Sequence, residues 1–165
     1  MNGYRAPSSG RGMAAAAIVI SLAAVGAALY TQYVWKMQPC PWCVLQRAIF
    51  SAVALAALPA LLWRARSPQA LSGVLMGLLA LCGIGAALWQ HFVAASSTSC
   101  KLTLADRIVS GIGLDALLPQ VFAAYASCAD AAVRLVGIPY EFYSVLLFVV
   151  LALLSAALLR RSRRR

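Results

Sequence analysis

The chain has 165 residues with a mean hydropathy of +0.84, and only 11% of its residues are charged. A soluble domain carries about 25% charged residues, so the composition excludes an ordinary soluble domain and indicates a polytopic membrane protein. The net charge of +10 does not indicate nucleic-acid binding, because the positive residues gather in short segments outside the apolar stretches, which is a signal of membrane topology.

Four apolar stretches are long enough to cross a bilayer, which takes about 20 residues. They cover residues 13–34, 44–63, 70–89 and 142–159. The first stretch could instead belong to a signal peptide, cleaved near Ala27 and Ala28, but it is longer than the apolar region of about 7–15 residues in such peptides. We therefore predict an all-α membrane protein in which a bundle of four transmembrane helices forms a single domain over residues 1–165.

The basic residues predict the orientation of these spans. Nine of the 14 lie in three short segments: Arg5, Arg11, Arg64, Arg66, Arg160, Arg161, Arg163, Arg164 and Arg165. Because such segments stay on the cytoplasmic side, four spans place both termini in the cytoplasm, where the terminal arginines could also contact anionic lipids. Two loops then face outward, a short one at residues 35–43 and a long one at residues 90–141.

The long loop is expected to have a function, as long loops in small proteins usually do. Apolar residues recur in it at helical spacing: Leu114, Leu117, Leu118, Val121, Phe122 and Tyr125. They predict a short helix, interrupted by Pro119 near its start, that lies along the membrane surface. Such a helix either brings Cys128 back towards the membrane or merely covers the bundle.

Four of the five cysteines fall in the outward loops: Cys40, Cys43, Cys100 and Cys128. A Cys-x-x-Cys pair is found in redox centres and in zinc sites. Zinc would recruit Cys100 and Cys128, but these lie far apart in the sequence, unlike the closely spaced ligand pairs of structural zinc sites. An oxidising location favours disulfides, so redox chemistry is the leading interpretation, ahead of two structural disulfides and of a metal site. Cys82, within the third stretch, is predicted to be an inert core cysteine.

Cys43 lies where the second apolar helix begins, so free N–H groups and the positive end of the helix dipole favour its thiolate. Arg47 follows four residues later on the same helix face, and its permanent charge favours the thiolate further. Alternatively, Arg47 is an interfacial arginine that reaches the membrane surface. A thiolate that faces lipid favours a lipid-soluble acceptor such as a quinone, and Arg47 could stabilise negative charge on a quinone oxygen.

His91 is the only histidine and ends the third stretch, at the same outer interface as Cys43. It could form part of the quinone site and donate or relay a proton to the reduced quinone. Alternatively, it could be only a polar residue among the lipid headgroups. The aromatic residues Trp35, Trp42, Trp89 and Tyr140 are predicted to form an interfacial belt, although Trp42 could also flank the quinone ring.

The cysteine pattern resembles the disulfide bond formation protein B (DsbB) family. The matching features are CPWC between the first two spans with an arginine four residues later, LPQVFAAYASCAD, and VGIPYEFYSVLLF at the start of the last span. The resemblance covers the chain from about Met13 to Leu159. Gln46 departs from the family pattern, in which an acidic residue can stand directly before the arginine. Vitamin K epoxide reductases are also four-helix quinone proteins, but they carry the pair at the start of a late helix.

The resemblance implies a protein-dithiol:quinone oxidoreductase of the bacterial inner membrane. It implies that a periplasmic DsbA-like thioredoxin-fold oxidase attacks Cys100 of a Cys100–Cys128 disulfide. Cys128 then exchanges with Cys40 of a Cys40–Cys43 disulfide. Finally, Cys43 beside Arg47 passes the electrons to ubiquinone or menaquinone from the membrane quinone pool.

Two other functions remain open from the sequence. One is a small transporter or scaffold whose loops are only stapled by two disulfides, which would not cycle between redox states. The other is a paralogous oxidase dedicated to one client, which would share the chemistry and differ only in its partner. None of these interpretations involves a metal or a nucleic acid.

Overall fold

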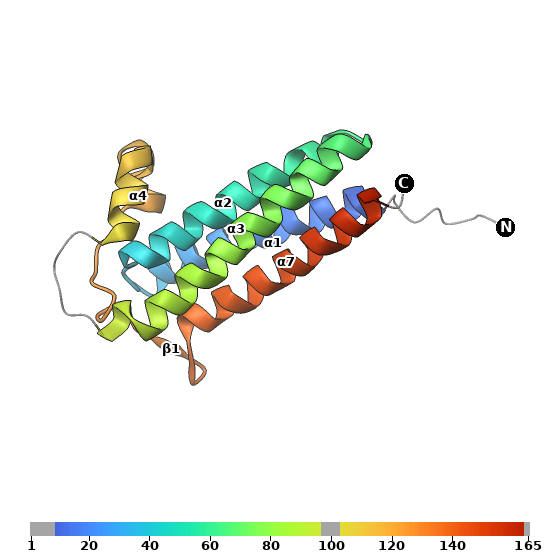
Figure 1. Cartoon of the computed structure of the whole chain (residues 1–165). Helices are drawn as coiled ribbons and strands as arrows, with labels where there is room; N and C mark the ends of the chain where they lie inside the picture. The colour runs from blue at the N-terminus through green and yellow to red at the C-terminus, as the bar shows by residue number, and fades with distance from the viewer. Residues whose placement is uncertain (1–8, 97–102, 164–165) are drawn as a thin grey trace.

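The computed structural model describes residues 9–96 and 103–163. Four long helices form an elongated bundle: α1 Ser9–Val34, α2 Pro41–Leu62, α3 Arg66–Phe92 and α7 Tyr140–Arg163. All four are long and apolar enough to cross a membrane. The start of α1, the turn between α2 and α3 and the end of α7 lie at one end of the bundle, and the segment with α4 lies at the other (Figure 1). The predicted all-α, four-helix membrane bundle is confirmed.

The core of the bundle depends on a close approach between α3 and α7. A Cβ atom added to Gly83 would lie 2.5 Å from the ring of Phe148. That ring is fully buried and stacks on Phe50 of α2 with 4.0 Å between the ring centroids. Small residues allow this kind of contact, which supplies much of the packing energy between membrane helices. Gly83 therefore leaves the space that Phe148 fills.

Replacing Gly83 with alanine is expected to destabilise the bundle. The added methyl overpacks the contact with Phe148, and overpacking of a core costs about 1–3 kcal/mol. Gly85→Ala is the matched control, because nothing lies within 4 Å of a Cβ at Gly85, and alanine is the better helix former. Thermal unfolding in detergent should show a lower midpoint for Gly83→Ala and an equal or higher one for Gly85→Ala. Equal midpoints for the two variants would contradict this account of the packing.

The long connection between α3 and α7 contains a short helix, but not where the apolar stripe predicts it. Residues 114–125 form two single turns, α5 Leu114–Leu117 and α6 Pro119–Phe122, instead of one helix. The break is at Leu118, whose backbone has φ −137° and ψ 70°. A proline disfavours helical geometry in the residue before it, so Pro119 separates the two turns.

The longest helix of this connection is α4, Leu104–Ile112, which the sequence analysis did not predict. Thr103 and Asp106 form a capping box at its start, in which each side chain accepts a hydrogen bond from the backbone of the other. Gly113, in the left-handed conformation, ends it with φ 76°. Ala105 and Val109 of α4 are buried in the same apolar cluster as Cys40, so α4 covers the cysteine end of the bundle. The short 3-10 helix η1, Ala94–Ser96, follows α3.

A two-stranded hairpin leads into α7. Strand β1, Arg134–Leu135, pairs antiparallel with β2, Ile138–Pro139. The turn residues Val136 and Gly137 both have positive φ, 52° and 82°, as expected for a tight two-residue hairpin turn. The hydroxyl of Tyr143 in α7 donates to the carbonyl of Leu135 at 2.9 Å, which holds the hairpin against the start of the helix.

Candidate active site

The Cys-x-x-Cys pair forms the first turn of α2. Cys40 is the N-cap, Pro41 occupies the first helical position, and the Cys40 sulfur accepts the backbone N–H of Cys43 at 3.3 Å. Proline suits this position because its missing N–H would have no partner there. The two sulfur atoms are 2.9 Å apart. Capping geometry therefore brings both sulfurs together at the positive end of the helix dipole.

Cys128 lies on the other side of Cys40. Backbone N–H groups of Tyr125 and Ala126 donate to the carbonyl of Pro39 at 3.0 and 3.3 Å, which ties the second loop to the first. The pKa of Cys40 is raised, first by its hydrogen bond to Cys128, then by that to Cys43 and by burial. The pKa of Cys128 is lowered, chiefly because Cys40 hydrogen-bonds to it. Cys40 is thus the proton-bearing thiol between two sulfurs.

Cys100 is a predicted site residue that lies outside the described residues. Its predicted disulfide with Cys128 therefore stays a prediction, and so does the disulfide between Cys40 and Cys43. The structure brings together Cys40, Cys43 and Cys128, although the third is far from the first two in the sequence.

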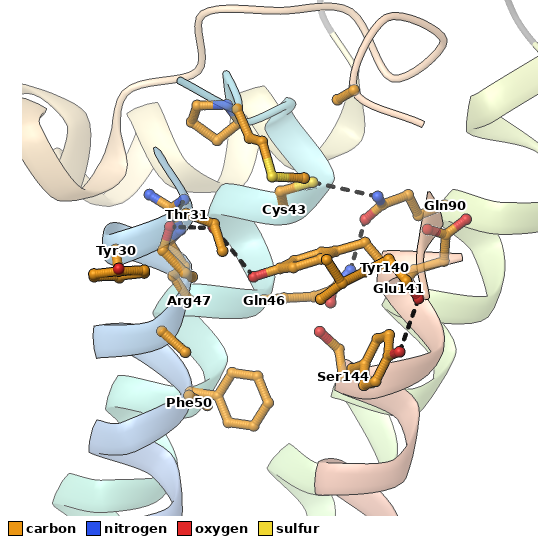
Figure 2. A pocket seen from close by; sticks show the side chains of 18 of the residues that line it. Tyr30, Thr31, Cys43, Gln46, Arg47, Phe50, Gln90, Tyr140, Glu141 and Ser144 are labelled. Atoms are coloured by element: carbon orange, nitrogen blue, oxygen red, sulfur yellow. Dashed lines mark hydrogen bonds between the residues drawn. The ribbon is translucent and has the colours of Figure 1, made fainter. Parts of the chain in front are cut away.

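A cavity of about 570 Å³ opens beside Cys43, between α1, α2, α3 and α7 (Figure 2). The polar and aromatic side chains on its wall include Cys43, Gln46, Arg47, Phe50, Gln90, Tyr140 and Glu141. On α1 the wall includes the small residues Ala24, Ala27 and Ala28, followed by Tyr30 and Thr31. A mostly apolar cavity of this size with a few converging polar groups is typical of a site for a small molecule.

Arg47 is buried in the bundle, with only 6% of its surface exposed. Its guanidinium donates to the Gln32 side-chain oxygen at 2.6 Å and to the carbonyls of Val121 and Ala28 at 3.1 Å each. The alternative of an arginine that reaches the membrane surface is therefore wrong. A guanidinium held by three acceptors keeps its charge in a defined place, here at the wall of the cavity next to Cys43.

Two buried glutamines connect α2 and α3 to the Cys43 sulfur. Gln46 donates to the side-chain oxygen of Gln90 at 2.7 Å, and the Gln90 amide nitrogen donates to Cys43 Sγ at 3.3 Å (Figure 2). Each glutamine is 4% exposed. Because a thiolate can only accept hydrogen bonds, this chain presents an N–H group to Cys43 and pairs the amide oxygen of Gln90 with Gln46. Sequence reasoning missed Gln90, for which polarity within an apolar span was the available signal.

His91 was predicted to bind the quinone, but the side chain of Glu141 lies between His91 and the cavity. Its Nδ1 is 2.6 Å from Oε1 of Glu141, and Glu141 is the residue of this pair that lines the cavity. The Glu141 side chain is 5% exposed and that of His91 is 30% exposed. Sequence reasoning missed Glu141, although an acid inside an apolar span is a signal in itself.

Two other sequence predictions, those for Cys82 and Trp42, need correction. Cys82 is exposed on the bundle surface instead of buried in the core. Trp42 is buried, with its ring 6.3 Å from that of Trp89, so it does not belong to an exposed belt, and it does not line the cavity beside Cys43. Tyr140 lines the cavity, and its hydroxyl is 3.4 Å from that of Thr31. Helix packing turned these side chains in directions that hydropathy does not record.

Comparisons with known proteins show the family of this chain. Residues 10–158 match the family model described as disulfide bond formation protein DsbB. Disulfide bond formation protein B of Pseudomonas syringae pv. tomato is 32% identical over 148 residues, which cover 89% of this chain and 88% of the relative. The protein of that name from Cupriavidus metallidurans is 32% identical over 153 residues, 88% of this chain and 90% of the relative. The chain belongs to the disulfide bond formation protein B family of membrane disulfide oxidoreductases.

Proposed function

We propose that this protein reoxidises a periplasmic DsbA-like thioredoxin-fold oxidase and passes the electrons to a membrane quinone. The observation that carries the proposal is the position of Cys43. Its sulfur is 2.9 Å from that of Cys40, which is hydrogen-bonded to Cys128, and it also lines the cavity of about 570 Å³. Three sulfurs thus lead from the second loop to a site that fits a small apolar molecule.

Thiol–disulfide exchange accounts for each step before the quinone. A thiolate of the donor attacks Cys100 of a Cys100–Cys128 disulfide and releases Cys128 as a thiolate. Cys128 attacks Cys40 of the Cys40–Cys43 disulfide, so a Cys128–Cys40 bond forms and Cys43 leaves as a thiolate. The second donor thiol then releases Cys100, which re-forms its disulfide with Cys128 and leaves Cys40 and Cys43 reduced.

The residues of the cavity suit a quinone, either ubiquinone or menaquinone. A bound quinone supplies an acceptor for two electrons and two protons. The buried Arg47 guanidinium would hold a quinone oxygen and favour negative charge on it. Phe50 offers an aromatic face, and the alanines of α1 leave apolar room for part of the isoprenoid chain. Gln90, held by Gln46, would keep the Cys43 thiolate directed at the same cavity.

Charge placement supports an inner-membrane location with both termini in the cytoplasm. Arg66, the first residue of α3, donates to the carbonyl of Arg163 at the end of α7 at 3.2 Å. The basic segments therefore meet at one end of the bundle, as the positive-inside rule requires of a cytoplasmic end. The cysteine end then faces the periplasm, where disulfides persist.

Turnover by the purified protein tests this function. With a reduced thioredoxin-fold oxidase and a soluble quinone analogue, we expect catalytic loss of the quinone absorbance. Cys40→Ser and Cys100→Ser should each remove it, because each breaks one of the two disulfides. Cysteines that stay oxidised throughout, with no turnover for any donor, would instead indicate a membrane scaffold stapled by disulfides.

A further inference from the structure

The pair formed by Glu141 and His91 has no part in the electron path described above. Among the described residues, Glu141 is the one carboxylic acid within the four membrane-spanning helices. It is 5% exposed, lines the cavity, and lies 2.6 Å from Nδ1 of His91. An ionisable group at such a depth is costly, and in membrane proteins it commonly marks a proton or ion pathway.

Proton balance at the cavity calls for such a group. Oxidation of the Cys40–Cys43 dithiol to its disulfide releases two electrons and two protons, and reduction of a quinone to a quinol takes up two of each. Cys43 reacts as a thiolate, so its proton has already left before the electrons move. The dithiol therefore brings at most one proton, that of the Cys40 thiol, to the reaction with quinone. At least one proton must therefore reach the cavity by another route.

We infer that Glu141 delivers this proton to the cavity and that His91 then reprotonates Glu141 with a proton taken from water outside the membrane. The inference rests on the proposed function. Glu141 donates a proton at the cavity wall and becomes a carboxylate. His91 takes up a proton from water on its other ring nitrogen, at its partly exposed side, and then passes the Nδ1 proton to Oε1 of Glu141, which leaves a neutral imidazole. Glu141 is thus a catalytic residue, and His91 is a positioning and relay residue behind it.

A purely structural role would give a different result. In that role, the Glu141 carboxylate in the first turn of α7 would only stabilise the positive end of the helix dipole. Its hydrogen bond to His91 would only hold α7 against α3. Other titratable or charged groups at the cavity are Cys43 and Arg47 on α2, Tyr30 on α1, and Tyr140 and Tyr143 on α7. Among the titratable groups at the cavity, only Glu141 is hydrogen-bonded to His91, whose imidazole is partly exposed at the surface.

The experiment measures the two half-reactions separately in the full-length protein. The first is reduction of the quinone-free protein by the donor dithiol, and the second is anaerobic reduction of a soluble quinone by the reduced protein. Glu141→Gln should slow the second at least about tenfold with its quinone KM within about twofold, because it removes a general acid. Glu141→Asp should recover part of the rate, and His91→Gln should slow the same step. Asp115→Asn, an exposed acid on α5, is the control for loss of negative charge.

A readout independent of turnover comes from His91, the only histidine of the chain. Nitrogen NMR of the quinone-free protein should show an Nδ1 bonded to a carboxylate, and Glu141→Gln should abolish that signature. An active wild type, with Glu141→Gln also reducing quinone at the wild-type rate, would overturn this inference and leave the proposed function standing. Equal slowing of both half-reactions in Glu141→Gln would assign the pair a structural role and overturn it too. If the wild-type protein reduces no quinone, both the proposed function and this inference are wrong.

Discussion

Replacing Cys43 with serine is expected to abolish quinone reduction, with a loss of about 10³-fold or more, as for removal of an essential nucleophile. Of the cysteines that the structure describes, Cys43 alone lines the cavity beside Arg47. Cys40 is fully buried under the second loop, so it cannot replace Cys43 at the cavity. Serine keeps the size of the side chain and its place in the first turn of α2 but is not a thiolate at neutral pH.

The Cys43→Ser variant should still form a mixed disulfide between Cys100 and the donor, because that exchange takes place in the second loop. Non-reducing gels after an acid quench would detect the mixed species while the quinone absorbance stays constant. Cys82→Ala is the matched control, since Cys82 is exposed on the bundle surface, and it should retain full activity. Normal quinone reduction by Cys43→Ser would show that another group delivers the electrons.

Replacing Arg47 with alanine is expected to raise the KM for quinone about tenfold or more. Loss of a charge-assisted hydrogen bond to the quinone costs about 1.5–3 kcal/mol. Among the described residues that line the cavity, Arg47 is the one permanently charged cation. The variant also loses the bonds to Gln32, Val121 and Ala28, so its thermal midpoint must be measured beside its kinetics. Arg47→Lys keeps the charge but not the three-way geometry and should be intermediate.

Arg107→Ala provides the reference for Arg47→Ala, because Arg107 is an exposed arginine of α4 away from the cavity. Its KM for quinone should equal that of the wild type. An unchanged KM in Arg47→Ala, together with a lower thermal midpoint, would limit Arg47 to holding α1 and α2 together.

Relations within one helix could be predicted from the sequence. Cys40, Cys43 and Arg47 are separated by three and four residues, so the helical repeat alone places them on one face. The four spans were predictable for a related reason, since a bilayer requires a continuous apolar stretch whatever its neighbours are. The long connection was harder, because the stripe at residues 114–125 was interrupted by Pro119, and the capping box at Thr103 was the better signal.

The sequence by itself determined the membrane class, the four helices and the Cys-x-x-Cys pair at a helix N-terminus, because each depends on local composition or spacing. Only the tertiary structure decided which partners these residues meet. Gln90 of α3 reaches Cys43 of α2, and Cys128 meets Cys40 across two loops. Glu141 of α7 pairs with His91 of α3. These contacts join segments far apart in the chain, and side-chain packing between helices, which no periodicity records, selects them.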